Sequence, residues 1–214
     1  MDRAERVLVV PRDVLLGFPE PALDGFRPGP ADDVLRLIDS AGFFAARCEV
    51  ETDPEVKQII PYAFVTSGPD VFLCERRPKG GEARLHGRVS LGLGGHVQEG
   101  DLKSGGTAQA VRHALERELR EEVLMESSYR VLVAGVLNDD AEPVGQVHFG
   151  IVYRVDIEEP RVRVLEDESL AGSFVPACEL WSYQERMESW SRILQGHFWP
   201  QPRPWQGVTK PPRS

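Results

Sequence analysis

The sequence predicts one mixed α/β domain, and three features carry this prediction. Segments rich in Val, Ile and aromatic residues, typical of strands, lie on both sides of a central stretch with helical periodicity. A second stretch with helical periodicity, residues 178–194, follows the last predicted strand. A chain of 214 residues is long enough for one sizeable core with terminal extensions. Because strands and helices do not alternate regularly, we expect a mixed sheet rather than a βαβ series.

The N-terminal part of the chain predicts short elements. Apolar residues over 6–17 suggest one or two short strands broken at Pro11, and the Pro- and Gly-rich residues 19–30 suggest a loop. Residues 31–40 place apolar side chains at helical spacing behind two aspartates, which predicts a helix that ends near Gly42.

The middle of the chain predicts most of the sheet. The segments IIPYAFVTSG and VFLCERR, joined by a turn at residues 68–70, are typical of a hairpin. Further predicted strands are RVSLGLGG, YRVLVAGVLND, VGQVHFGIVYRVDI and RVRVLED. The tail WPQPRPWQGVTKPPRS has too many prolines for a helix, so we expect an extended arm or disorder.

Composition narrows the class of protein. The net charge of -9 and pI near 5.1 disfavour an extended nucleic-acid surface. No run of eighteen apolar residues spans a bilayer, and the N-terminus lacks the pattern of a signal peptide, so we expect a cytoplasmic protein outside the membrane. The three cysteines, Cys48, Cys74 and Cys178, form no CxxC pair, which favours buried small apolar side chains over a disulfide framework.

Three acids mark the central helix as a candidate metal site. Glu118, Glu121 and Glu122 stand at i, i+3 and i+4, so a helix presents them within an arc about 100° wide. Clustered carboxylates repel one another, and a hard cation such as Mg²⁺ or Mn²⁺ relieves the repulsion. An ordinary solvated face is the competing interpretation, since i,i+4 ion pairs are also present on this helix.

Glycines and cations precede the helix. Gly94 and Gly95 end a predicted strand, where the backbone can approach a ligand closely and offer a carbonyl oxygen to a metal. A basic cluster just ahead of the glycine turn could grip phosphates, or could protect a hairpin edge from pairing. His96 in the turn is a candidate substrate contact, whereas His148 in an apolar strand is expected to be a satisfied sheet residue. The cluster comprises Arg76, Arg77, Lys79, Arg84 and Arg88.

Together, GGHVQEGD and RELREE resemble the signature box of the Nudix (MutT-like) hydrolases. The second half of the box matches residue by residue, from Arg117 to Met125, apart from Leu124 in place of the glycine that ends the helix. In the first half Asp101 replaces a glutamate and lies sixteen positions before Arg117, where the family has eight, which implies an eight-residue insertion. Either Asp101 or Gln109 could supply the acidic or polar brace of the loop, and the sequence leaves this choice open.

The resemblance covers about residues 58–182 and implies a Nudix-type α/β/α sandwich with a mixed sheet. We expect a Nudix domain over 58–198, an N-terminal extension over 1–57 packed on the core, and a Pro-rich tail over 199–214. The extension and tail are candidates for a homodimer interface or a lid.

The resemblance also implies a function: hydrolysis of a diphosphate linkage in a small nucleoside diphosphate derivative or similar phosphorylated metabolite, with Mg²⁺ as cofactor and Mn²⁺ as a substitute. Glu118, Glu121, Glu122 and the Gly94 carbonyl would bind the metal, and Arg117 would orient a glutamate. Substrate contacts would come from Arg76, Arg77, Arg84 and His96. Glu121 or Glu122, or an acid of the segment LEDES such as Glu166 or Glu168, would act in catalysis.

Two other functions remain open at the level of sequence. A Nudix domain that senses a nucleotide without turnover would suit the altered box. The isomerase branch, which acts on isopentenyl diphosphate, ranks last because it depends on a cysteine and none lies in the glycine turn.

Overall fold

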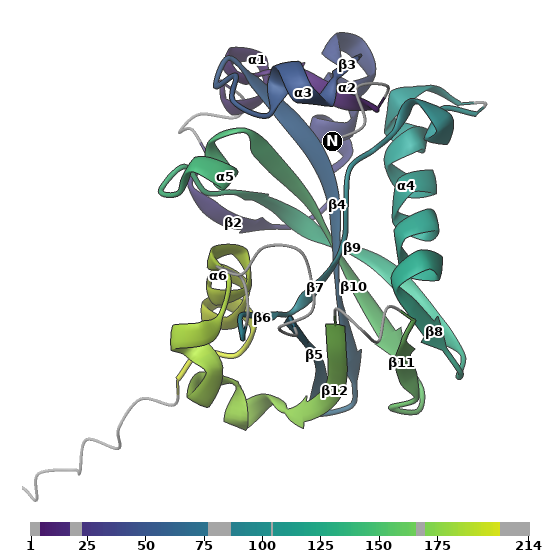
Figure 1. The fold of residues 1–214 in the computed structure, drawn as a ribbon, viewed down its shortest axis with the longest axis vertical. Helices are drawn as coiled ribbons and strands as arrows, with labels where there is room; N and C mark the ends of the chain where they lie inside the picture. The colour runs from purple at the N-terminus through teal and green to yellow at the C-terminus, as the bar shows by residue number, and fades with distance from the viewer. Residues whose placement is uncertain (1–4, 18–22, 77–86, 104, 166–169, 202–214) are drawn as a thin grey trace, which may run out of the picture.

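A computed structural model describes residues 5–17, 23–76, 87–103, 105–165 and 170–201 of the chain. These residues form a mixed α/β fold around a ten-stranded sheet whose main path runs β12-β5-β4-β10-β9-β2. The fold class predicted from the sequence is confirmed, since the sheet is mixed and helices cover both of its faces (Figure 1).

The strands of this sheet are β1 (Arg6–Pro11), β2 (Gly25–Pro28), β3 (Phe43–Ala46), β4 (Val56–Ser67), β5 (Asp70–Arg76), β6 (Val89–Ser90), β7 (Gly92–Gly94), β9 (Tyr129–Asn138), β10 (His148–Ile157) and β12 (Leu170–Pro176). Strands β8 (Val123–Met125) and β11 (Val162–Val164) form a separate pair. The helices are α1 (Arg12–Leu16), α2 (Asp32–Ala41), α3 (Arg47–Val50), α4 (Gly106–Glu122), α5 (Pro143–Gln146) and α6 (Ser189–Phe198), with 3-10 turns η2 (Glu99–Asp101) and η3 (Ala177–Arg186).

Strand β4 is the centre of the core. It pairs with β10 in parallel, and it is buried from residue 57 to residue 67. Successive side chains of a strand point to opposite faces. Ile59, Ala63 and Val65 therefore pack in the cluster beneath α4, while Tyr62 and Phe64 pack in the cluster beneath α6. Burial on both faces explains why the sequence shows an unbroken apolar run here rather than an alternation.

The two helical layers differ in origin. Helix α4, together with α1 and α2 from the N-terminal region, covers one face of the sheet, and α6 with η3 covers the other (Figure 1). The predicted hairpin is confirmed, with Thr66 opposite Val71 and Ser67 opposite Asp70. No helix of the described residues is long and apolar enough to cross a membrane.

The N-terminal region corrects two predictions from the sequence. The predicted strand or strands over 6–17 are one strand, β1, followed by helix α1, whose Leu15 and Leu16 are buried. The predicted loop over 19–30 contains strand β2, which pairs with β9 at Gly25↔Asn138. Both elements are too short for hydrophobic periodicity to identify, and tertiary pairing stabilises them. The predicted helix over 31–40 is confirmed as α2, with Gly42 as its C-cap.

The C-terminal region also differs from expectation. The helix predicted over 178–194 is divided: η3 ends at Arg186, and α6 begins at Ser189 and extends to Phe198. Strand β12, not predicted from the sequence, pairs with β5 along its whole length. The tail lies outside the described residues from position 202 onward. Of the three cysteines only Cys74 is buried; Cys48 and Cys178 are exposed, contrary to the expectation of burial.

Candidate active site

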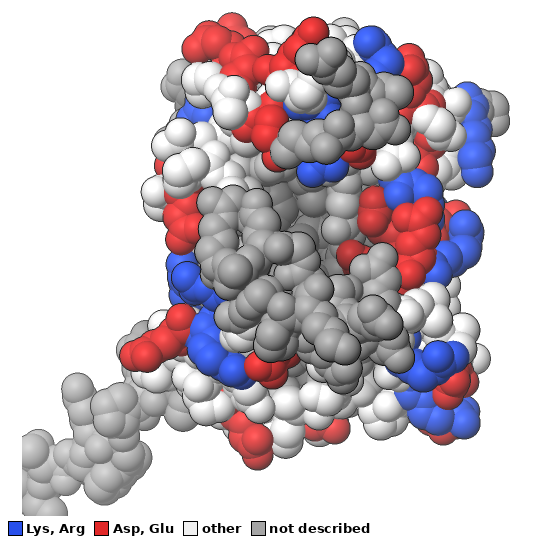
Figure 2. All heavy atoms as spheres, viewed as in Figure 1, with Lys and Arg blue, Asp and Glu red and all other residues white. Residues whose placement is uncertain are grey.

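Helix α4 presents its acids to the glycine turn because its apolar stripe docks on the sheet. Val111, Leu115 and Leu119 form this stripe, and all three are buried. The side chain of Glu118 is 14% exposed, whereas that of Glu121 is 57% exposed. Acidic and basic side chains gather over α4 on the face shown in Figure 2. The stripe therefore sets the rotation of the helix, and the rotation partly buries Glu118 while leaving Glu121 in solvent.

Two carboxylates lie against the backbone of the glycine turn. The Gly94 N–H donates a hydrogen bond to Glu122 Oε2 at 3.1 Å. A Cβ added to Gly95 would lie 2.6 Å from Glu118 Oε1, so any side chain there would collide with the carboxylate. Gly94 itself has a φ of +141° and passes so close to the Pro61 carbonyl that a Cβ would lie 2.0 Å from its oxygen. Only glycines allow this approach of helix and turn.

Pairing with β4 holds the turn in place. Strand β7 is antiparallel to β4, with Gly94 opposite Tyr62 and Gly92 opposite Phe64. A Cβ at Gly92 would overlap the Tyr62 ring at 1.8 Å. The glycines predicted to approach a ligand thus also allow the turn to pack on the central strand.

Arg117 clamps the site together. Its Nε and Nη2 donate to the two oxygens of Asp101 at 3.0 and 2.9 Å, and Nη2 also donates to the His96 carbonyl at 2.9 Å. Its Nη1 donates to Glu118 at 2.7 Å and to Glu121 at 3.1 Å. One guanidinium therefore links the loop after the turn to two acids of the helix, and its predicted role in orienting a glutamate for catalysis stays a prediction.

Asp101, rather than Gln109, braces the loop after the glycine turn. Asp101 is 5% exposed and belongs to η2, whereas Gln109 is exposed on α4. In addition to the contacts with Arg117, Asp101 Oδ2 accepts a hydrogen bond from the Gln98 N–H at 2.9 Å. Asp101 therefore fixes both the loop and the arginine.

Burial and neighbouring charges shift the pKa values of the clamp. Hydrogen bonding to Asp101 is the main cause that raises the pKa of Arg117. Burial raises the pKa of Glu118, and it outweighs the opposing effect of Arg117; the nearby charges of Glu121 and Asp101 act in the same direction as burial. A carboxylate destabilised in this way favours binding of a cation.

The donor set of this site suits a hard cation. Glu118 and Glu122 offer carboxylate oxygen atoms, the ligands that Mg²⁺ and Mn²⁺ prefer, whereas Gly94 turns its N–H toward Glu122, so the predicted Gly94 carbonyl ligand stays a prediction. In the part of the chain that the structure describes, no three Asp, Glu, His or Cys side chains converge as a metal cluster. The prediction that Glu118, Glu121 and Glu122 together bind metal therefore stays a prediction, with Glu121 held by Arg117 in this conformation.

His96 and His148 form a pair beside the turn. Their Nε2 atoms are 3.2 Å apart, and His148 Nδ1 lies 2.6 Å from the Val144 carbonyl oxygen. Burial lowers the pKa of both rings, that of His96 to about 3, with Arg47, His148 and Arg117 lowering it further. A neutral His148 must donate from Nδ1 to the carbonyl, so its Nε2 accepts and His96 Nε2 donates. Each ring thus has one defined tautomer.

A cavity of about 380 Å³ opens next to the glycine turn. His96, His148 and Trp190 line it, together with Arg88, Arg192 and Glu142. His96 lines this cavity, and its predicted contact with substrate stays a prediction. His148, expected to be a satisfied sheet residue, lines the same cavity. Trp190 reaches the cavity from α6 and packs edge-on against Tyr62, with 5.3 Å between the two ring centroids.

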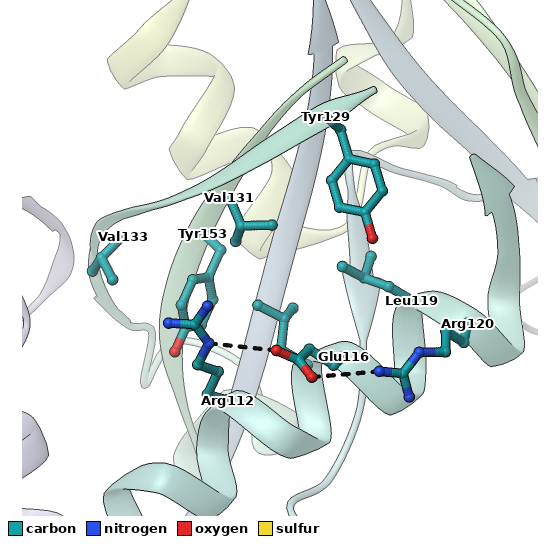
Figure 3. Close-up of a pocket in the computed structure, with 9 residues that line it drawn as sticks. Arg112, Glu116, Leu119, Arg120, Tyr129, Val131, Val133 and Tyr153 are labelled. Carbon is teal, nitrogen blue, oxygen red and sulfur yellow. Dashed lines mark hydrogen bonds and ion pairs between the residues drawn. The ribbon is translucent and has the colours of Figure 1, made fainter. Parts of the chain in front are cut away.

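A second cavity, of about 350 Å³, lies on the other flank of α4 (Figure 3). Glu116 lies between Arg112 and Arg120 there, over a floor that includes Leu119 and Val131. Neither Glu118 nor Glu122 lines this cavity. Glu116 therefore belongs to α4, like Glu118 and Glu122, but lies away from the glycine turn.

Several predicted residues lie outside the described part of the chain. They are Arg77, Lys79, Arg84, Glu166 and Glu168, and the side chain of Arg76. Their predicted roles in substrate binding or proton transfer therefore stay predictions. Of the basic cluster, Arg88 is described and lines the cavity beside the turn.

Sequence reasoning missed the contribution of residues 139–148 and of α6 to this cavity. The signal was weak, because Glu142, Val144 and Trp190 belong to no motif and come together only in the tertiary structure. The insertion before Arg117 was predicted to be a loop. Much of it is the first turns of α4, which begins at Gly106 and packs on α2.

Comparisons with known proteins extend the similarity beyond the acidic helix. The chain is 33% identical over 199 residues to the protein YmaB of Bacillus subtilis (strain 168), covering 89% of this chain and 95% of YmaB. The crystal structure of Tm1382, described as a candidate Nudix hydrolase, matches with a TM-score of 0.77 and 32% identity over 90% of this chain and 97% of that one. No protein-family model matches the sequence. Coverage of this extent includes much of residues 1–57, so the N-terminal region is part of the shared fold.

Proposed function

Because the chain belongs to the Nudix hydrolase family, we propose that it is a Mg²⁺-dependent pyrophosphohydrolase that cleaves a diphosphate linkage in a nucleoside diphosphate derivative or a similar phosphorylated metabolite. The observation that carries the proposal is the approach of two helix carboxylates, Glu118 and Glu122, to the backbone of Gly94 and Gly95. This arrangement supports a binding site for a cation that in turn binds phosphate oxygens.

The residues of the site divide the work between binding and orientation. Glu118 and Glu122 would hold the ion with the Gly94 carbonyl, and Glu121 would join them after a rotamer change that releases Arg117. Mg²⁺, or Mn²⁺ in its place, would neutralise the diphosphate charge and lower the pKa of a bound water. Arg117 would keep Glu118 aimed at the turn through its contacts with Asp101 and the His96 carbonyl.

Glu121 has two alternative roles: it binds the metal with Glu118 and Glu122, or it stays outside the metal site and is then our candidate, among the acids that the structure describes, for the group that takes the proton from water. The Glu121 carboxylate is exposed, so it can reach a water molecule, and it lies one helical turn from the partly buried Glu118. Glu122 is the alternative. Glu166 and Glu168 retain the same candidacy from the sequence alone.

The cavity beside the turn would receive the group attached to the diphosphate. His96 would contact substrate from the turn, and Arg88 with the predicted Arg76, Arg77 and Arg84 would offer cations to the phosphates. The cavity would then be continuous with the diphosphate site, because Gly94 and Gly95 belong to the glycine turn and also line the cavity.

The experiment is a panel of nucleoside triphosphates, nucleotide sugars, ADP-ribose and dinucleotides, incubated with Mg²⁺ and with Mn²⁺ and analysed for the two phosphorylated products that cleavage of a diphosphate linkage gives, a nucleoside monophosphate and either pyrophosphate or a second phosphomonoester. We expect turnover of at least one compound, with loss of about 100-fold or more in kcat for Glu118→Gln and Glu122→Gln. Glu116→Gln is the matched control, since it removes an acid from the same helix on the flank shown in Figure 3. It should retain wild-type activity.

Three outcomes would contradict the proposal. Tight nucleotide binding without turnover would favour the sensing module, and formation of an allylic diphosphate would favour the isomerase. Activity that survives both Glu118→Gln and Glu122→Gln would show that the reaction takes place elsewhere.

A further inference from the structure

We propose that Lys57 and Asp140 are positioning residues that hold the wall of the substrate cavity formed by residues 142–148. The wall supplies Glu142, Val144 and His148 to the cavity beside the glycine turn. The kinetic part of this inference rests on the proposed function, whereas its structural part does not. It also assigns a role to the N-terminal region, through Arg12.

Lys57 is fully buried, which is rare for an ammonium group. It is 0% exposed at the start of β4, where Val10 of β1 pairs with it. Its Nζ lies 2.6 Å from Asp140 Oδ1 and donates to the Gly145 carbonyl at 2.7 Å. A buried charge needs such partners, because an unpaired one is strongly destabilising. Both partners belong to the segment that leads from β9 to β10, so Lys57 ties this segment to the central strand.

Arg12 makes the second attachment. It forms an ion pair with Asp140 and donates from Nη1 to the Gln146 carbonyl at 3.1 Å. Burial alone would raise the pKa of Asp140, but hydrogen bonds from Lys57 and Arg12 hold it below its ordinary value, so the carboxylate stays ionised. Two cations from the N-terminal half of the chain thus converge on one acid of the connecting segment.

Backbone packing restricts the same segment. The Gln58 N–H donates to the Val147 carbonyl at 2.7 Å, and a Cβ at Gly145 would lie 1.7 Å from the Asp139 carbonyl oxygen. The ammonium of Lys57 therefore meets a carbonyl whose position is already closely constrained. Helix α5 has only four residues and is too short to be stable by itself, so its position depends on these backbone contacts together with the contact with Lys57.

The constraint passes from this segment to the active site. The Val144 carbonyl, one residue before Gly145, accepts the hydrogen bond from His148 Nδ1. His148 Nε2 then accepts from His96, and the His96 carbonyl accepts from Arg117. Each step is a hydrogen bond at or below 3.2 Å. Lys57 therefore acts on the cavity through His148, without contacting the cavity itself.

The first test uses NMR of the imidazole nitrogens and needs no substrate. In the wild-type protein we expect His148 to be protonated at Nδ1 and unprotonated at Nε2. In Lys57→Met, which keeps the length of the side chain but removes its charge, His148 should lose this single tautomer. Thr66→Val is the matched control: it removes a hydrogen bond to Asp156 from a buried residue at the far end of β4. It should leave the His148 signals unchanged.

The second test is kinetic. Lys57→Met should raise KM about tenfold, while kcat changes by less than about threefold, because the metal-binding acids stay in place. Thr66→Val should change neither. If Lys57→Met does not fold, Arg12→Gln removes only the partly exposed cation and should give the same His148 change to a smaller degree.

The outcomes are separable from those of the proposed function. A chain that turns over no diphosphate compound, but in which Lys57→Met or Arg12→Gln disturbs His148, would support the inference alone. Retention of the wild-type His148 tautomer in Lys57→Met, or in Arg12→Gln if that variant alone folds, would overturn it. Equal disturbance of His148 in Thr66→Val would also overturn it, because the effect would then be general loss of stability.

Discussion

Asp101 accepts hydrogen bonds on both carboxylate oxygens from Arg117, a residue sixteen positions later in the chain. The pair is largely buried, with side-chain exposures of 7% for Asp101 and 23% for Arg117. It holds the arginine in the one orientation that also reaches Glu118 and the His96 carbonyl. The insertion before Arg117 thus leaves the contact between brace and clamp intact.

Replacing Asp101 by Asn should reduce both activity and stability. The amide cannot accept on both sides, so Arg117 loses its fixed orientation and Glu118 its support. We expect kcat to fall about 10- to 100-fold and the free energy of unfolding to fall by about 2 kcal/mol. Steady-state kinetics and urea denaturation measure the two effects. A variant with wild-type kcat would show that the brace is dispensable, and Arg112→Gln, on the outer flank of α4, is the control.

A methyl group at position 95 should disturb the site without disturbing the core. The Cβ of Gly95→Ala would lie 2.6 Å from Glu118 Oε1, so the carboxylate must move. We expect a loss of about 100-fold in kcat, typical of a displacement of about 1 Å at a reacting group. Gly100→Ala is the matched control, because nothing lies within 4 Å of its added Cβ. Equal activity of the two variants would contradict the placement of Glu118.

The start of α4 should depend on a side chain from another helix. Asp39 of α2 accepts hydrogen bonds from the Ala108 N–H at 2.7 Å and from the Thr107 hydroxyl at 3.0 Å. It satisfies a helix N-terminus in the manner of a capping residue. Asp39→Ala should lower the free energy of unfolding by about 1 kcal/mol, measured by urea denaturation. Activity should be unchanged, since Glu118 lies ten residues, or about 15 Å, further along the helix. Asp33→Ala is the control: it removes an exposed acid from α2, the helix that contains Asp39, and should have less effect on the free energy of unfolding.

The effect of His148 on stability should depend on pH. Burial lowers the pKa of His148 in the folded chain, so below its unfolded value of about 6.5 the unfolded state binds more protons. The stability contributed by neutral His148 is therefore present above this pH and decreases as pH falls toward the lower folded value. We expect His148→Gln to be more destabilising at pH 7.5 than at pH 5, with a change of at most about 1.4 kcal/mol per pH unit. Equal destabilisation at both pH values, measured by urea denaturation, would contradict a buried neutral His148.

Local patterns predicted much of the fold. The hairpin of β4 and β5, helix α2 with its end at Gly42, and the strands β9, β10 and β11 agree with expectation. In these elements the spacing of apolar residues, or the residues of the turn, is enough to identify the local structure. Strands β2 and β12 were not predicted, because a short strand is stabilised by the neighbour with which it pairs, β9 and β5 respectively.

In the candidate active site, too, some features follow from the sequence and others from the tertiary structure. The spacing of Glu118, Glu121 and Glu122 and the stripe from Val111 to Leu119 follow from the helical repeat, so the sequence by itself determined that these acids share one side of α4. Which of them meets the turn depends on how the stripe docks on the sheet. That docking partly buries Glu118 and exposes Glu121.

The remaining features were decided only by the tertiary structure. The choice of Asp101 over Gln109, the pairing of His96 with His148, and the burial of Lys57 against Asp140 all join residues far apart in the chain. No local period encodes such contacts, because they depend on where the sheet brings separate segments together. The sequence therefore determined the chemistry that is available on α4, and the tertiary packing that brings residues 142–148 and α6 next to the glycine turn decided the shape of the cavity beside it.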